Sequence, residues 1–171
     1  MQTIHNGAAK LEALGPGQAF RFHFRDETAI GLKAQFNRGA GNDAALVLTP
    51  TTALKTGAFL SSFDVGDVVP LAQAKIVPST KPGTVTPGKG NFAQPGEIEL
   101  HGGRLLFVTR PHGDDRITYR VDLQSGDISR SSPVAPVEIY SEWTIQDATA
   151  TLHEHKPTPP EPTESVLIAV G

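Results

Sequence analysis

Residues 19–36 have the sequence AFRFHFRDETAIGLKAQF, and this stretch decides the fold class. Aromatic and polar side chains alternate through residues 19–25. Because successive side chains of a strand point to opposite faces, the alternation predicts a half-buried strand. A second alternation fills residues 30–36, shortly after the acidic pair Asp26-Glu27. Two such runs with so short a polar gap predict a β-hairpin.

The same periodicity recurs through both halves of the chain and defines the expected core. The residues expected to be mostly buried are Phe20, Phe22, Phe24, Ile30, Leu32, Ile117, Tyr119, Val121, Ile139 and Trp143. In contrast, Ala45–Thr49 is apolar on both faces, which predicts a central strand of the sheet. Pro70 cannot donate a ladder hydrogen bond, so the run Val68–Val77 is expected at a sheet edge or after that proline.

Short strands separated by turn residues predict an all-β domain over residues 1–153, either an antiparallel β-sandwich or a jelly-roll-like barrel. Glycine (17 residues) and proline (14 residues) are too frequent for a helical bundle. Only Ala8–Leu14, with Asn6 as a candidate N-cap, has a helical pattern. No internal repeat with a period of about 20–50 residues is visible.

The long stretch Pro78–Gly96 carries four prolines and four glycines, which predicts a long loop without a regular element. Within it, Gly83–Gly90 matches the G-x-x-x-x-G-K part of a phosphate-binding loop. The next residue is Gly90 rather than a serine or threonine that would hold Mg²⁺, and no helical pattern follows. Nucleotide binding is therefore not expected.

Composition excludes several functional classes. The chain has 171 residues, a formal net charge of −3 and no cysteine. Disulfides, cysteine-ligated metal and thiol catalysis are thus excluded, and no overall positive field favours nucleic acid. No stretch is long and apolar enough to span a membrane, and the N-terminal residues lack the pattern of a secretory signal. We expect a soluble protein without cofactor.

Two groups of cations are candidate binding residues. Arg21, His23 and Arg25 share the polar face of the first predicted strand and form a cationic stripe. Lys81 and Lys89 make the long loop locally basic, since no acidic residue lies between Asp67 and Glu97. A solvated strand face and an inert surface loop are the alternatives.

Aromatic and histidine residues give two further candidates. Tyr140 alternates with apolar neighbours and is expected on the polar face of its strand, where an exposed aromatic ring can contact a ligand. His153 and His155 are two residues apart, so on a strand they share a face and could hold a metal ion between them. A solvated strand end is the alternative for this pair.

The last residues, 154–171, form an expected arm. Glu154–Ser165 contains four prolines, which favour extended polyproline II, and Val166–Val170 is a short apolar strand candidate. Left in water this strand would be prone to aggregation. We expect Val166, Leu167 and Ile168 to add to an exposed sheet edge, either of the same chain or of a neighbouring subunit.

No catalytic constellation is recognisable in the sequence. The function expected is a non-catalytic binding or assembly module that acts through protein–protein contacts, including contacts between copies of itself. The alternative is a β-barrel enzyme, or a small-ligand or carbohydrate binder, with a histidine-based metal site. The identity of the partner does not follow from the sequence.

Overall fold

The computed structural model describes residues 7–36, 42–130, 135–148 and 150–157, and their secondary structure is almost entirely β, as predicted. The strands are β1 (Ala19–Phe24), β2 (Glu27–Phe36), β3 (Asp43–Val47), β4 (Ala58–Ser61), β5 (Val68–Leu71), β6 (Ala74–Pro78), β7 (Val85–Pro87), β8 (Ile98–His101), β9 (Arg104–Pro111), β10 (Tyr119–Asp122), β11 (Asp127–Ser129), β12 (Glu138–Tyr140), β13 (Trp143–Asp147) and β14 (Ala150–His155). Two short 3₁₀ helices, η1 (Leu11–Ala13) and η2 (Ser62–Asp64), accompany them.

The predicted hairpin is β1–β2, paired from Ala19–Leu32 to Phe24–Glu27. Its two turn residues, Arg25 and Asp26, both have positive φ (48° and 67°), as in the turns that match the right-handed twist of a hairpin. The predicted faces are confirmed, because the three cations of residues 21–25 are exposed and Phe20 and Phe22 are buried.

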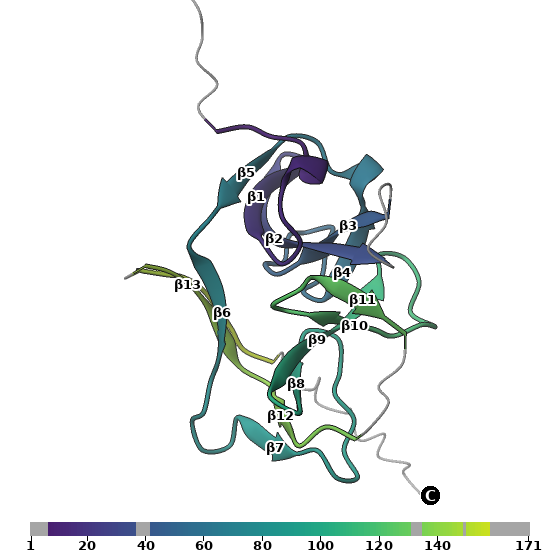
Figure 1. The fold of residues 1–171 in the computed structure, drawn as a ribbon, viewed down its shortest axis with the longest axis vertical. Coiled ribbons are helices and arrows are strands. Elements are labelled where there is room, and N and C mark those ends of the chain that lie inside the picture. Colours follow the sequence, from purple (N-terminus) through teal and green to yellow (C-terminus); the bar gives the residue numbers. More distant parts are fainter. Residues whose placement is uncertain (1–6, 37–41, 131–134, 149, 158–171) are drawn as a thin grey trace, which may run out of the picture.

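A closed ring of strands forms the centre of the fold (Figure 1). The strands β10, β11, β2, β3, β4 and β9 pair in this order, and β9 pairs back with β10. The pairs β11–β2 and β4–β9 are parallel, and the other four pairs are antiparallel. Because the ring closes, each of its six strands pairs with a ring neighbour on both edges, which makes the ring a β-barrel.

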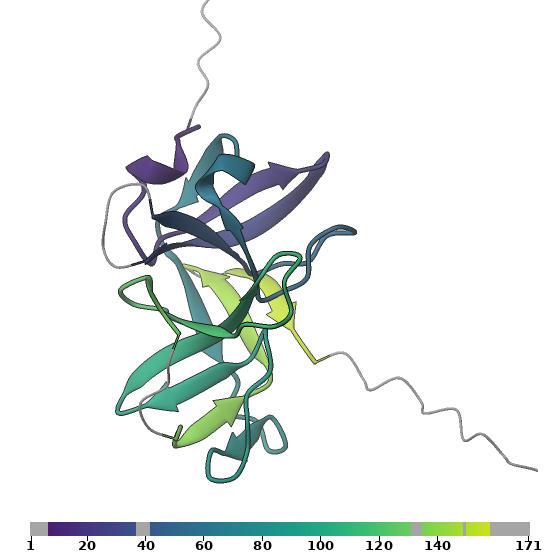
Figure 2. The ribbon, with the colours of Figure 1, turned by 90° about the vertical axis from the view of Figure 1, so that its right-hand side faces the viewer.

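Further strands branch from the barrel, and a small sheet lies beside it (Figure 2). β1 pairs with β2 of the barrel and, on its other side, with β5. In the same way, β8 pairs with β9 of the barrel and with β12, and β12 pairs in turn with β7. Pro70 lies on β5, whose only strand partner among the described residues is β1, so its predicted place at an edge is confirmed. The second sheet has the order β14-β13-β6.

The pairings repeat themselves, which the sequence did not reveal. β1 to β6 and β8 to β13 repeat the same pairings. In each half the first two strands form a hairpin, and the second, third and fourth strands form an antiparallel meander. The fourth strand then pairs in parallel with the second strand of the other half, and the fifth strand pairs with the first. Even the outermost contacts correspond, since Ala9 bridges to Val68 of β5 as β7 pairs with β12. The chain is thus built from two topologically equivalent halves, which Figure 1 shows in purple to teal and in green to yellow.

The two halves meet in the antiparallel pair β6–β13. Ile76 lies opposite Ile145, with Lys75 opposite Gln146 and Val77 opposite Thr144 on either side. A pseudo-two-fold rotation that exchanges the two halves also exchanges the flanking residue pairs. Its axis therefore passes between Ile76 and Ile145. β14 has no counterpart among the described residues of the other half, and the counterpart of β7 is only the isolated bridge at Ala9.

Two hydrophobic clusters stabilise this arrangement. The larger fills the barrel and the space under the small sheet, and includes Leu46, Phe107, Val121 and Trp143. The smaller lies outside the barrel, where Leu11 and Leu14 cover Phe20 and Phe22. Seven of the residues predicted to be buried are buried, whereas Phe24, Ile117 and Tyr119 are partly exposed.

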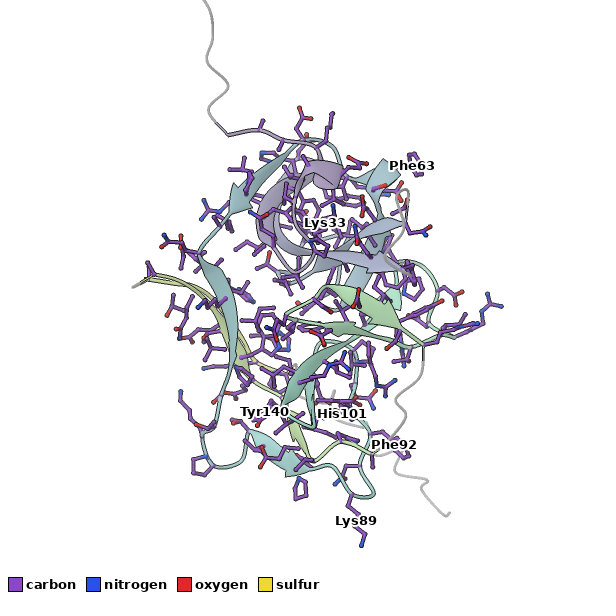
Figure 3. All side chains as sticks on the ribbon, in the orientation of Figure 1. Lys33, Phe63, Lys89, Phe92, His101 and Tyr140 are labelled. Carbon is purple, nitrogen blue, oxygen red and sulfur yellow. The ribbon has the colours of Figure 1, made fainter. Side chains whose placement is uncertain are left out.

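Buried Lys33 fastens the N-terminal segment to the barrel. Its Nζ donates to the carbonyl oxygens of Leu14 (2.7 Å) and Glu12 (3.0 Å) and lies 3.5 Å from Asp43 Oδ1. Figure 3 shows the lysine among the strands of the upper half. A charge so deeply buried requires such partners.

Two local predictions are wrong. The helical pattern of Ala8–Leu14 yields only the 3₁₀ turn η1 with Lys10 at its N-cap position, and Asn6 lies outside the described residues. The stretch Pro78–Gly96 contains a regular element, β7, because Val85–Pro87 can pair along β12 despite the flanking prolines and glycines. No helix among the described residues could span a membrane.

Truncating Phe22 to alanine should lower the free energy of unfolding by about 3–5 kcal/mol, because a well-packed aromatic side chain leaves a cavity. Phe63→Ala is the matched control, since the Phe63 side chain is 92% exposed. Chemical denaturation of both variants measures the difference. Equal stability of the two would contradict the assignment of Phe22 to the core.

Candidate functional site

An open cleft of about 440 Å³ lies between β6 and the end of the barrel. Its walls are mainly aliphatic, and the residues that matter below are Ala19, Leu32, Ala74, Ile76, Leu123 and Ile145. Lys75, Arg104 and Gln124 lie at its polar rim. We call this space the β6 cleft. Its volume is within the range of binding pockets.

The equivalent space in the other half is filled. Trp143 is at the start of β13, where Ala74 is at the start of β6, and its side chain is only 1% exposed. The indole packs edge-on against Phe107 and donates its Nε1 hydrogen to the carbonyl oxygen of Gly96 (2.8 Å). The β6 cleft therefore exists because alanine replaces tryptophan in the first half.

β14 completes the filled side. It pairs along β13 and brings both of its histidines onto the indole of Trp143. The His155 ring stacks on it with centroids 4.7 Å apart and planes 17° apart. Burial, and then the neighbouring His153, lower the pKa of His155 to about 4, so this ring is neutral at physiological pH.

The prediction that His153 and His155 share a strand face is thus confirmed, but both rings pack on an indole. Burial also lowers the pKa of His153. No group of three or more histidine, cysteine, aspartate or glutamate side chains in the described part of the chain has a metal-binding arrangement. Within the described residues, the geometry therefore offers no third metal ligand beside His153 and His155.

One ion pair fixes the rim of the β6 cleft. Arg104 donates from Nε (2.8 Å) and Nη2 (2.7 Å) to Asp122 Oδ2. Burial alone would raise the pKa of Asp122, but hydrogen bonds from the Ser125 amide, Arg104 and the Gln124 amide lower it. The carboxylate therefore stays charged and holds the β10–β11 turn beside the cleft.

A buried polar cluster occupies the outer face of the second half. Glu99 is 1% exposed and accepts hydrogen bonds from Arg120 Nε (2.7 Å) and Nη2 (3.1 Å). His101 Nε2 lies 2.8 Å from the same carboxylate. Burial would raise the pKa of Glu99, but the hydrogen bonds from Arg120 and His101 lower it below the ordinary value. Glu99 stands between the apolar residues Ile98 and Leu100, a pattern typical of a solvent-facing side chain, so the sequence does not reveal this cluster.

Replacing Glu99 by glutamine should destabilise the fold by about 3–5 kcal/mol, because it leaves the Arg120 guanidinium buried without its counter-charge. The double variant Glu99→Met with Arg120→Met removes both charges and should recover much of that loss. Denaturant unfolding of the two variants measures the difference. A double variant less stable than Glu99→Gln would contradict the ion-pair explanation.

Stability should also depend on pH in the acid range. The folded pKa of Glu99 lies below the unfolded value of about 4.5, so its stabilising contribution is complete above that pH. It is lost as the pH falls through the folded pKa. Unfolding followed between neutral pH and pH ~3 should show a smaller loss in the Glu99→Met, Arg120→Met variant than in the wild type.

The cationic stripe has the predicted exposure. Arg21 and His23 point to solvent from β1, and Arg25 lies in the turn with its guanidinium 5.5 Å from the centre of the Phe24 ring. His23 shares a hydrogen bond with Thr28 Oγ1 (3.2 Å). The stripe lies on the first half, and nothing in its geometry identifies a ligand.

The two loop lysines are exposed but are separated by β7. Lys81 lies four residues before the start of that strand, near Pro78 and Ser79 at the end of β6. Lys89 projects from the opposite end of the molecule to η1 (Figure 3). The segment Gly83–Gly90 includes β7 and begins no helix.

The prediction that Tyr140 is an exposed aromatic is wrong. The residue is 8% exposed, and its hydroxyl donates to Glu138 Oε2 (2.6 Å). This hydrogen bond, together with burial, raises the pKa of Tyr140 to about 12. The chain turns at Ser141 and Glu142 from one sheet to the other, so Tyr140 and Trp143 both enter the larger core.

A second pocket, of about 490 Å³, lies on the far side of the barrel near Lys55, Arg110, His112 and Asp115. Val166, Leu167 and Ile168 lie outside the described residues, so their predicted strand is not tested.

Comparison with protein-family models, curated protein sequences and solved structures finds no match to this chain.

Proposed function

We propose that this protein is a non-catalytic binding or assembly module that takes an extended segment of a protein partner as an added strand on β6. The proposal rests on one difference between the two otherwise equivalent halves, namely the strand that lies along the outer edge of the small sheet. β13 has β14 along its outer edge, whereas the described residues place no strand along the corresponding edge of β6. The open edge of β6 thus corresponds to the edge of β13 that β14 occupies.

The backbone of β6 supports this role. The Ser79 amide donates to the Glu142 carbonyl, so residue 79, and by alternation Val77 and Lys75, direct their backbone groups toward β13. Ile76 and Ala74 consequently direct theirs toward the open edge. Pro78 has no N–H, so the usable edge is short. Strand addition obtains affinity from such main-chain hydrogen bonds.

The β6 cleft supplies specificity beside that edge. A strand docked on β6 places alternate side chains over Ala19, Leu32 and Leu123, in the space that Trp143 fills in the other half. Large apolar side chains bury the most area there, and burial of apolar area is the main driving force for association. The expected partner is an extended apolar segment with at least one large side chain.

The chemistry of the cleft supports binding rather than catalysis. An active site requires convergent polar groups in a concave pocket. Here the walls are aliphatic, and Arg104 and Asp122 at the rim neutralise each other.

Replacing Ala74 by tryptophan should fill the β6 cleft as Trp143 fills its counterpart and should abolish binding. The probe is a library of random peptides displayed on phage, selected on the wild-type protein and then tested on the variant. We expect selected peptides with alternating apolar residues that bind Ala74→Trp at least about tenfold more weakly.

Ala72→Trp is the matched control, because Ala72 is exposed in the turn before β6. It should retain binding. Peptides that bind the wild type and both variants equally, or a failure to select any peptide, would contradict a strand-accepting edge at β6.

A further inference from the structure

We propose that the segment that docks on β6 is Val166–Val170 of a second copy of this chain, so that the protein assembles by exchanging its C-terminal arms. This inference rests on the proposed function, since it names the partner of the same edge. Residues 166–170 lie outside the described part of the chain, and the argument uses their sequence and the place where β14 ends.

The chemistry of the segment fits the cleft. Val166–Val170 has the sequence VLIAV, which is uncharged, apolar and rich in β-branched residues, as strands are. Its five residues equal the five of β6, Ala74–Pro78. Aliphatic side chains on one face of this strand meet the aliphatic walls formed by Leu32, Ile76 and Leu123.

The charges next to the segment are complementary to those next to β6. A strand antiparallel to β6 begins at the Pro78 end, which places Glu164 beside the exposed Lys81. Exposed Lys75 adds a second positive charge along the same edge. Complementary charges of this kind fix the direction and register of docking.

The direction of β14 selects a second copy over the same chain. β14 and β6 are both antiparallel to β13, so they run the same way, and His155 and Pro78 lie at the same end of the small sheet, each opposite Trp143. To dock antiparallel on its own β6, the chain would have to reverse direction immediately after β14.

The sequence available for that reversal is rich in proline. Pro157, Pro159, Pro160 and Pro162 favour polyproline II, which continues straight for several residues. In that conformation, at ~3.1 Å per residue, eight residues span about 25 Å. This composition disfavours the reversal and favours docking on another molecule.

The experiment uses the full-length chain and two variants with complementary defects. Ile168→Asp places a charge in the docking segment, and Ala74→Trp fills the cleft. Sedimentation velocity over a concentration series should show that the wild type self-associates and that each variant associates at least about tenfold more weakly. Ala72→Trp and Val137→Asp, at exposed positions elsewhere, should behave as the wild type.

Mixing the two defective variants gives the decisive result. Ile168→Asp keeps an intact cleft and Ala74→Trp keeps an intact arm, so an equimolar mixture should form a mixed complex that neither forms alone. Thermal unfolding of each variant checks its fold. If Ala74→Trp does not fold, Lys81→Glu replaces it and should be rescued by mixing with Glu164→Lys.

Two outcomes would overturn the exchange. One is a wild type that stays monomeric at every concentration, and the other is self-association that both variants retain. If phage-displayed peptides still bind the β6 edge in either case, only the identity of the partner is wrong. If no peptide binds, the proposed function fails as well.

Discussion

Closure of the barrel depends on two places where backbone lies directly on backbone. A Cβ atom at Gly57 would lie 2.5 Å from the Gly96 nitrogen, and one at Gly126 would lie 2.5 Å from the Gly17 nitrogen. Both Gly57 and Gly126 have positive φ, and each precedes the strand that forms a parallel pair with the other half. These contacts correspond under the pseudo-two-fold, so each half of the ring is closed by the same glycine-to-glycine approach.

On this common backbone the two halves carry different chemistry. Phe20 in the first half and Glu99 in the second occupy equivalent positions outside the barrel, one in an apolar cluster and the other in an ion pair with Arg120. Ala74 and Trp143 are equivalent positions under the small sheet. The second half is completed by its own side chains and by β14, and the first half is left with a cleft and an edge. The two halves therefore differ in their side chains and in the added strand β14, while the pairing of their common strands is the same.

The sequence predicted what depends on local periodicity. The β1–β2 hairpin, the buried β3 and the edge position of Pro70 follow from alternation and from the missing proline N–H. The two-fold repeat was not predictable because equivalent positions share backbone pairing but not residue type, as Phe20 and Glu99 illustrate. Tyr140 was misplaced because the corner at Ser141 and Glu142 changes sheets and breaks the alternation. The β6 cleft was not visible because it results from residues brought together only by the small sheet.

The order in which the ring is assembled follows from its two parallel pairs. β2 is made early in the chain, but one of its ring neighbours is β11, where Gln35 pairs with Asp127, and β4 likewise waits for β9. Parallel pairing between strands so distant in sequence is slow, since a long loop must close before any contact is gained. On the ribosome, the first half therefore emerges with the end of β2 and all of β6 unpaired, and it must remain so until nearly the whole domain has been synthesised. Nascent chains are consequently most exposed to misassociation with one another in this interval.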